Sequence, residues 1–444
     1  MKKVLSFALC LLLIFCLALP VFAAKDPISE IELDSQGVYL WNLETDTALY
    51  TKGADLRMYP ASITKVMTVL VVLENCADTT GTFITSPGQE LYQIILDDNG
   101  MNMAIKPGET FTVQQLLEAT LLNSYCDSAQ LLAWYFGGHD VSKFVDMMND
   151  KVAAMGLTNT HFQNAHGLHS YGHYSSPRDL AMIFREAMKD ERFMQLIRLR
   201  TSSIPATEYS KERPLQYSIN MFFPDNPYYF EPIVGGKSGF TDEAGRCQVT
   251  YCEKDGVSYI LVLMGANMDT SREYPTWNMT YPETRQLLEY AYENFEIKTL
   301  FVKGQVVTKL AINHSDDTIP VVADEEIRVL VRKGADPEYR LKGLPAFIDV
   351  SGIQNGTEIG KLELVFSDEV ASAKKLVLSY QGQEIHMKSE VGEGASAFFA
   401  IFKSDKIFVI LIVILALIFV GFIIFLFAAR AAARKRRRRH TPKH

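Results

Sequence analysis

The residue types and spacing best suited to catalysis occur early in this 444-residue chain, at Ser62 and Lys65. Residues three apart on a helix share one face, with Cβ atoms about 5–6 Å apart. Pro60 and Ala61 would start such a helix, and the largely apolar residues 66–73 would carry the lysine into the core. Burial favours the neutral amine of a lysine, which can then take the proton of a serine hydroxyl. The pattern therefore predicts Ser62 as a nucleophile with Lys65 as its base.

A second group of chemically useful residues lies further along the chain, in the run Gly235-Gly236-Lys237-Ser238-Gly239-Phe240-Thr241. A flexible glycine pair is followed by a cation, a hydroxyl and a glycine on a predicted strand. Such a strand can present Lys237 to a substrate carboxylate and a backbone N–H to an oxyanion. Taken alone, the run is better explained as a glycine-rich turn that carries a surface lysine.

The two motifs together are more specific than either one alone. Ser-x-x-Lys at a buried helix start, followed by Lys-Ser-Gly on a late strand, is the signature of the serine enzymes that recognise penicillin. On these motifs the chain closely resembles the D-alanyl-D-alanine carboxypeptidases, the low-molecular-weight penicillin-binding proteins. Further similar segments are residues 164–168, 173–181 and 239–245. The resemblance covers nearly the whole chain. It implies an α/β (α+β) serine penicillin-binding, β-lactamase-like domain, then a small all-β domain and a C-terminal transmembrane helix.

The third motif of that family, Ser-x-Asn, is where this sequence departs from the pattern. The loop between two predicted helices reads Ser124-Tyr125-Cys126, with cysteine in place of asparagine. A literal Ser-x-Asn at residues 218–220 precedes the Lys-Ser-Gly strand and matches a different segment of the family. We therefore expect Ser124 to be the functional serine. A thiol is a much weaker hydrogen-bond donor than an amide, so substrate geometry, rate and acyl-transfer preference stay open.

The resemblance implies a role for each of these residues. Ser62 would attack the penultimate carbonyl of a peptidoglycan stem peptide ending in D-Ala-D-Ala, assisted by Lys65. Ser124 would help to return the proton to the departing D-alanine, and Cys126 would take the substrate-binding place of the asparagine. The backbone N–H groups of Ser62 and Phe240 would hold the oxyanion. The other predicted substrate-binding residues are Lys237, Ser238, Gly239 and Thr241. β-Lactams should trap Ser62 as a slow ester, and no cofactor is implied.

Two alternative functions remain open from the sequence. In the same site, an amine acceptor in place of water would give a DD-transpeptidase, and cleavage of a crosslink would give an endopeptidase. The other alternative is a catalytically impaired peptidoglycan-binding protein, in which Cys126 marks the loss of activity. A β-lactamase is disfavoured, because neither the predicted β-domain nor the predicted anchor suits one.

Four histidines fall within thirteen residues, at His161, His166, His169 and His173. Such a cluster could indicate a metal site. Neither a His-Glu-x-x-His pair nor an acid at ligand spacing accompanies them, however. His166 and His173 also match a structural segment of the resembled family, so we predict no metal site.

The elements that must position these residues are predicted within residues 24–296, the expected catalytic domain. Residues 37–42 and 47–51 are typical of a strand hairpin, and residues 259–264 of a central strand. Ser176, Pro177 and Asp179 carry the start signals of a helix that reaches about residue 188. Other helices are predicted over residues 66–73, 116–122, 129–136 and 283–295. The sheet is expected to be antiparallel and flanked by helices.

The pattern changes near residue 297, where short β-rich runs alternate with turn signals. The clearest runs are residues 305–310, 327–331, 361–366 and 376–380. They predict a small β-rich domain over residues 297–391, and residues 392–406 are a linker.

Both ends of the chain look like targeting segments. Residues 1–23 have the charged, apolar and small-residue order of a secretory signal peptide. Residues 407–429 are uncharged and long enough to span a membrane as a helix, and residues 430–444 form a basic tail. Because positive charge stays cytoplasmic, the sequence predicts a single-pass protein of the cell membrane with its catalytic domain outside.

The charge of the chain is unevenly distributed. The first 23 residues and residues 430–444 carry two and eight basic side chains and no acids. The part between them holds 34 basic and 52 acidic residues, a net charge of −18. Nothing there would neutralise phosphates, so no nucleic-acid partner is expected.

Four cysteines remain after the predicted signal peptide, at positions 76, 126, 247 and 252, too few for a disulfide scaffold. Cys247 and Cys252 bracket a predicted strand. Side chains five apart on a strand face opposite sides, so these two are not expected to bond each other.

Overall fold

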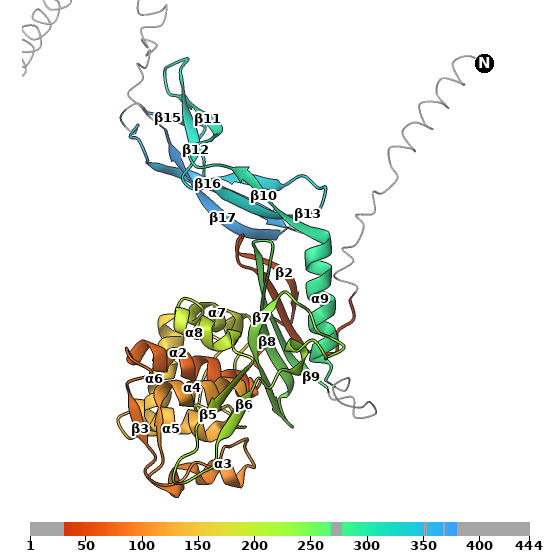
Figure 1. Ribbon diagram of the computed structural model, residues 1–444. Coiled ribbons are helices and arrows are strands. Elements are labelled where there is room, and N and C mark those ends of the chain that lie inside the picture. Colours follow the sequence, from red (N-terminus) through yellow and green to blue (C-terminus); the bar gives the residue numbers. More distant parts are fainter. Residues whose placement is uncertain (1–30, 268–277, 350, 352, 367–368, 380–444) are drawn as a thin grey trace, which may run out of the picture. The chain divides into compact units, whose positions relative to one another are not determined.

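The computed structural model describes residues 31–267, 278–349, 351, 353–366 and 369–379 (Figure 1). The predicted signal peptide, linker, membrane span and basic tail lie outside these residues. Within the described part of the chain, no helix is long and apolar enough to cross a membrane.

A five-stranded antiparallel sheet forms the framework of the catalytic part, with strand order β2-β1-β9-β8-β7. The strands are β1 (Gly37–Asn42), β2 (Thr47–Lys52), β7 (Ile233–Thr241), β8 (Gly245–Lys254) and β9 (Val257–Ala266). The predicted hairpin and the predicted central strand are both confirmed. Residues 259–264 of β9 are completely buried, since helices cover both faces of the sheet.

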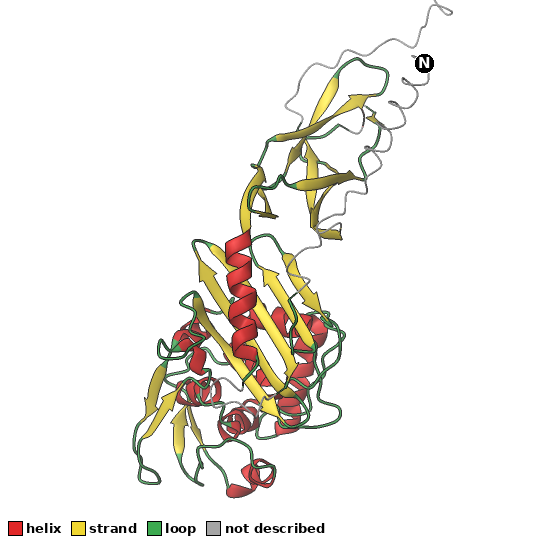
Figure 2. Ribbon diagram, turned by 90° about the vertical axis from the view of Figure 1, so that its right-hand side faces the viewer, coloured by secondary structure: helices red, strands yellow, loops and turns green. Residues whose placement is uncertain are grey.

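Figure 2 shows α9 lying across one face of this sheet, while the remaining helices gather on the other face. The helices are α2 (Lys65–Asn75), α3 (Gln93–Asp97), α4 (Val113–Leu122), α5 (Cys126–Phe136), α6 (Val141–Ala154), α7 (Pro177–Ala187), α8 (Glu191–Arg198) and α9 (Thr280–Asn294). Short 3-10 turns are η2 (Ala61–Thr64), η3 (Gln89–Tyr92) and η4 (Asn220–Phe222). The α/β class and the flanking helices are therefore as predicted.

Local sequence signals explain where several of these helices begin. The Ser176 side chain accepts a hydrogen bond from the Asp179 backbone N–H, and Pro177 is the first helical residue of α7, as predicted. At the start of α4, Thr112 and Gln115 form a reciprocal capping box. Helix α2 is apolar around its circumference, and its residues from Lys65 to Leu73 are all buried.

Two short strand pairs were not predicted from the sequence. They are β3 (Phe83–Thr85) with β4 (Thr110–Thr112), and β5 (Thr201–Ile204) with β6 (Arg213–Gln216). Strands of three or four residues are too short to show a clear alternation of apolar and polar residues.

The chain after α9 is built from strands, and the described residues from 295 onward contain no α-helix. The strands are β10 (Phe295–Phe301), β11 (Val306–Ile312), β12 (Thr318–Ala323), β13 (Ile327–Arg332), β14 (Glu338–Lys342), β15 (Phe347–Ile348), β16 (Glu358–Phe366) and β17 (Glu369–Leu378). Antiparallel ladders join β10 with β13, β11 with β12, and β14 with β16. The predicted all-β character is confirmed, and the four predicted runs fall in β11, β13, β16 and β17.

All four described cysteines are buried and free. Cys247 and Cys252 both lie on β8 and form no bond with each other, as predicted.

Candidate active site

Ser62 lies in the turn η2, directly before α2 begins at Lys65. The sequence predicted a regular helix start at Pro60 and Ala61. Instead, Ala61 adopts a left-handed φ of +46°, and the chain makes a 3-10 turn before the α-helix begins. Left-handed backbone at a residue other than glycine is strained and is often found at functional sites. Ser62 stays partly exposed in this turn, while Lys65 is fully buried.

Two glycines from distant segments of the chain pack against this turn. A Cβ atom on Gly167, whose φ is +83°, would lie 1.9 Å from the carbonyl oxygen of Ala61. A Cβ atom on Gly239 of β7 would lie 2.7 Å from the backbone nitrogen of Ser62. Both positions therefore require glycine, because the backbone of each glycine lies too close to the turn η2 to leave room for a Cβ atom.

We predict that Gly167→Ala slows acylation by a penicillin more than about tenfold and destabilises the fold by about 1–3 kcal/mol, through overpacking and a strained φ. Gly156→Ala is the matched control, since Gly156 has a φ of +69° but nothing within 4 Å of its Cβ position. The control should lose stability and keep its labelling rate. Labelling rate and melting temperature measure both effects, and a wild-type rate in Gly167→Ala would contradict the close approach.

The amine of Lys65 sits at the centre of the site. Its Nζ lies 2.8 Å from Ser62 Oγ, 2.6 Å from the carbonyl oxygen of His166 and 3.4 Å from Cys126 Sγ. A neutral amine has two N–H groups and one lone pair. Those two N–H groups suit the carbonyl and the sulfur, which leaves the lone pair for the hydroxyl proton of Ser62.

Burial lowers the pKa of Lys65 from its ordinary value, although the neighbouring Cys126 and the charge of Asp127 both act in the opposite direction. The net shift favours the neutral amine. Ser62 and Lys65 therefore form the hydroxyl–amine pair that the spacing predicted, with the geometry needed for proton transfer.

A second buried lysine, Lys237 on β7, contacts the loop between α4 and α5. Its Nζ donates to Ser124 Oγ at 2.9 Å and to the carbonyl oxygen of Ser238 at 2.8 Å. Burial and then the charge of Lys65 hold the pKa of Lys237 well below its usual range. A bound carboxylate would reverse this effect by favouring the ammonium form. Ser124, with a left-handed φ of +61°, thus contacts Lys237. The resemblance implied a role for Ser124 in proton return but no contact with Lys237.

Cys126 is the first residue of α5 and is 2% exposed. Its sulfur faces the amine of Lys65, and its backbone N–H donates to the carbonyl oxygen of Met101 at 2.6 Å. The residue expected to bind substrate in place of asparagine is therefore also a direct neighbour of the predicted base.

The predicted binding residues on β7 are consecutive, and Gly239 among them approaches the turn η2. The two glycines at positions 235 and 236, which the sequence suggested to be flexible, lie within β7. There, Cβ atoms would come within 2.3 and 2.1 Å of backbone carbonyl oxygens, so close packing rather than flexibility requires glycine. The Thr241 hydroxyl accepts from the Ala244 N–H in the β7–β8 turn, and the Phe240 ring lies 4.2 Å from the guanidinium carbon of Arg246.

Two residues near this site were not predicted from the sequence. Ser218 Oγ lies 3.4 Å from Ser238 Oγ, because the Ser218 N–H is bonded to the carbonyl oxygen of Leu122 at the end of α4. The literal Ser-x-Asn pattern at residues 218–220 was the available signal. Asp127, directly after Cys126, is buried and adds charge near Lys65. Acidic residues are common at helix starts, so the position of Asp127 in the sequence did not indicate a functional role.

The histidines of the 161–173 segment have separate structural contacts. His173 Nε2 lies 2.7 Å from Thr64 Oγ1, and its Nδ1 accepts from the Gln163 N–H at 3.1 Å. Burial lowers the pKa of His173 to about 3 and that of His166 well below its usual value, so both rings are neutral. Among the described residues, no three His, Cys, Asp or Glu side chains are grouped to hold a metal ion.

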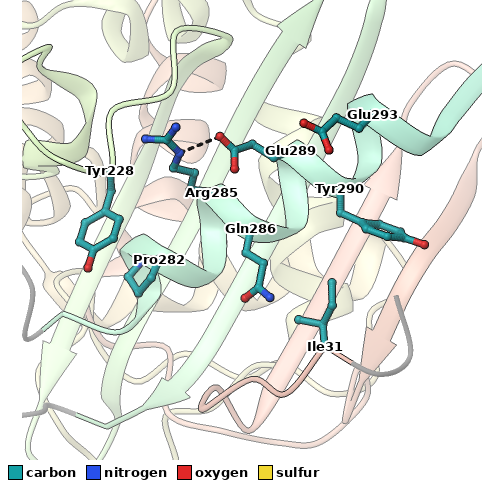
Figure 3. A pocket seen from close by; sticks show the side chains of 8 residues that line it. All are labelled: Ile31, Tyr228, Pro282, Arg285, Gln286, Glu289, Tyr290 and Glu293. Atoms are coloured by element: carbon teal, nitrogen blue, oxygen red, sulfur yellow. Dashed lines mark hydrogen bonds and ion pairs between the residues drawn. The ribbon is translucent and has the colours of Figure 1, made fainter. Parts of the chain in front are cut away.

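A surface hollow lies along α9, lined by residues that include Tyr228, Arg285 and Glu289 (Figure 3). Its main polar feature is the ion pair of Arg285 Nε with Glu289 Oε1 at 2.7 Å. None of the predicted site residues lines it, so it is separate from the Ser62 site.

Comparison with known proteins gives two family matches for this chain. The family model for Peptidase S11, D-alanyl-D-alanine carboxypeptidase, matches residues 21–268, and the model for the penicillin-binding protein 5 C-terminal domain matches residues 295–384. The D-alanyl-D-alanine carboxypeptidase DacF of Bacillus subtilis is 28% identical over 374 residues, covering 83% of this chain and 92% of the relative.

Two solved structures are also similar. Penicillin-binding protein 5 from Haemophilus influenzae superposes with a TM-score of 0.63 at 22% identity, covering 79% of this chain and 97% of that one. A mutant of the Streptomyces K15 DD-transpeptidase has a TM-score of 0.53 at 26% identity, covering 59% of this chain and 99% of that one.

The chain belongs to the Peptidase S11 family of D-alanyl-D-alanine carboxypeptidases, because the family model covers more than half of it. It is thus a serine-type hydrolase of this family, as the motifs predicted, and carries the C-terminal β-domain of penicillin-binding protein 5.

Proposed function

We propose that this enzyme removes the terminal D-alanine from peptidoglycan stem pentapeptides through an acyl-enzyme on Ser62, and that β-lactams inhibit it covalently. The observation that carries this proposal is the 2.8 Å contact between Ser62 Oγ and the Nζ of the fully buried Lys65. Family membership supplies the substrate class.

In the acylation step, Lys65 takes the Ser62 proton while Oγ attacks the penultimate carbonyl carbon. The carbonyl oxygen becomes an oxyanion, which rests on the backbone N–H groups of Ser62 and Phe240. The close approach of Gly239 to the Ser62 nitrogen supports this pairing, since it brings the two backbone segments together. When the intermediate collapses, the C–N bond breaks and the amine of D-alanine receives the proton that Lys65 took from Ser62.

The terminal carboxylate of the substrate lies against Lys237 and the hydroxyls of Ser238 and Thr241. The present contacts of Lys237 are both with neutral oxygens, so an incoming carboxylate gives the lysine its first ionic partner. Water then attacks the acyl-enzyme, again with Lys65 as base. A β-lactam has no departing fragment, so the ester on Ser62 persists.

A second candidate outcome is transfer of the acyl group to an amine. One observation favours it: the similarity to a DD-transpeptidase. Incubating the enzyme with a pentapeptide and an acceptor amine separates the outcomes, because hydrolysis gives tetrapeptide and transfer gives a longer product.

D-alanine release from a pentapeptide tests the main proposal, with Cys126→Asn as the informative variant. An asparagine amide donates a hydrogen bond that the thiol makes poorly, and such a bond contributes about 1 kcal/mol. We therefore expect release by the wild type and a rise in kcat/KM of about three- to tenfold in Cys126→Asn. Cys126→Ser is the control for loss of the sulfur alone. No release by the wild type, with retained binding to isolated cell-wall sacculi, would instead support the impaired-binding alternative.

We also propose that residues 1–23 direct export and that residues 407–429 anchor the protein in the cell membrane. The catalytic domain, over residues 24–296, and the β-domain, over residues 297–391, then work outside the cell, where peptidoglycan lies. In intact cells, added protease should digest the catalytic domain. A variant that ends at residue 406 should be released into the medium, while the full chain should stay with the membrane. Equal release of both forms into the medium would contradict the anchor.

A further inference from the structure

Asp127 is a buried carboxylate that the proposed reaction does not use. It is the second residue of α5 and is 1% exposed. One oxygen, Oδ2, accepts from the backbone N–H groups of Met103 at 3.0 Å and Ile105 at 3.3 Å, and Oδ1 accepts from that of Ser128 at 3.0 Å. No salt-bridge partner is found for it within the described part of the chain. A buried ionised group without an ionic partner is destabilising and calls for a reason.

The carboxylate holds a loop, residues 99–105, against the start of α5. Asn99 and Ala104 in this loop have left-handed φ values of 51° and 55°. The loop is bonded to α5 a second time, through the N–H of Cys126 and the carbonyl oxygen of Met101 at 2.6 Å. From its other side, Arg213 Nε donates to the carbonyl oxygen of Met103 at 3.1 Å. Hydrogen bonds thus hold the first turn of α5 and the loop 99–105 together.

We propose that Asp127 is a positioning residue for the reaction proposed above: it fixes the first turn of α5, and with it Cys126, against Lys65. The inference rests on the proposed function, because it assigns Lys65 the role of base. Lys65 contacts Cys126 directly, so the adjacent carboxylate acts both through that contact and through space.

The charge of Asp127 acts on the pKa of Lys65 and on the pKa of two tyrosines. Tyr92 of η3 and Tyr125 before α5 are neutral near pH 7, and burial together with the charge of Asp127 raises the pKa of both. Arg213 is already paired with Glu109, at 2.7 Å.

Asp127 itself responds to burial, which raises its pKa to about 6. Because this folded-state pKa is above the ordinary one, the folded protein takes up a proton more readily than the unfolded chain as the pH falls towards 4. Ionised Asp127 therefore lowers stability above about pH 6. Both oxygens of Asp127 accept backbone N–H groups, which an asparagine could not do because its NH2 group donates, so the carboxylate is needed to hold the loop and the first turn of α5 together.

The test measures the acylation rate with a fluorescent penicillin between pH 7 and 9, where Asp127, with a pKa of about 6, is mostly ionised. In the wild type the rate should rise with pH as Lys65 loses its proton. Asp127→Asn removes the negative charge, so Lys65 loses its proton at lower pH, and the rise should move to lower pH. At the acidic end of the range, the acylation rate as a fraction of the plateau rate should be at least about threefold higher for the variant than for the wild type.

Asp179→Asn is the matched control. Asp179 is also buried near a helix start and accepts from the Asn159 N–H at 3.0 Å and the Thr160 hydroxyl at 2.8 Å, but its charge is not among those acting on Lys65. This variant should lose thermal stability without moving the pH profile. An unmoved profile in Asp127→Asn, or an equal movement in Asp179→Asn, would overturn the proposal.

Asp127→Glu provides an independent test if the asparagine variant does not fold. It keeps the charge but adds a methylene, which displaces the loop, so the plateau rate should fall about tenfold while the profile keeps its position. A wild-type plateau or a shifted profile would contradict the positioning role. Failure of the wild type itself to acylate would instead refute the proposed function, so the two failures are distinguishable.

Discussion

Replacing Ser62 with alanine is expected to lower D-alanine release on the order of 10^4-fold or more, because no other group can form the acyl bond. The turn η2 holds Ser62 between Gly167 and Gly239, and alanine fits the same backbone, so the variant should fold normally. Release of D-alanine from a pentapeptide, followed by chromatography, measures the effect.

Ser124→Ala separates the roles of the two serines. Its hydroxyl contacts Lys237 rather than Lys65, so this variant should still bind penicillin covalently but acylate and release product more slowly. If Ser62→Ala retained activity while Ser124→Ala lost all covalent labelling, the assignment of the nucleophile would be wrong.

Lys65→Met is expected to slow acylation about 10^2- to 10^4-fold, the usual contribution of a general base. Methionine is unbranched, is one atom shorter than lysine and suits a fully buried position, so its effect reports mainly the loss of the amine. In the wild type, acylation should fall as the pH is lowered, because burial lowers the pKa of Lys65 and only the neutral amine accepts the Ser62 proton. The residual rate of Lys65→Met should lack this dependence.

Lys237→Met is the control for removal of a buried amine. Lys237 is equally buried but contacts Ser124 and Ser238, so its loss should raise KM for a peptide with a free carboxylate more than it lowers acylation by saturating penicillin. Wild-type acylation by Lys65→Met across the pH range would eliminate Lys65 as the base.

Some of the structure could be predicted from short sequence patterns. The apolar residues after Lys65 specified a buried helix, and Ser176 with Pro177 specified the start of α7, since these signals act within one or two helical turns. The pair of Ser62 and Lys65 was predictable for the same reason, because a spacing of three is maintained by the turn itself.

Contacts between distant segments could not be predicted. The left-handed backbone of Ala61 depends on Gly167, more than a hundred residues away, and on the passage of β7 over the turn. Ser218 reaches Ser238 only because the end of α4 holds its backbone. The bonds of Asp127 to the loop 99–105 likewise depend on tertiary packing, for which helix-start acids give no signal.

Cys126 illustrates how the structure changes the meaning of a sequence difference. From the sequence it was a missing amide donor to the substrate. In the structure its sulfur also lies 3.4 Å from the Nζ of Lys65, so the change from asparagine alters the surroundings of the base itself. This is why we expect Cys126→Asn to change the rate and not only the affinity.

The most direct test of the account is to locate the covalent adduct that a penicillin leaves on the wild-type protein. After brief incubation, digestion and mass spectrometry, we predict a single penicilloyl ester on the peptide that contains Ser62. A penicilloyl group found on Ser124 or on any other residue, or its absence from a folded protein that releases D-alanine, would contradict the central claim.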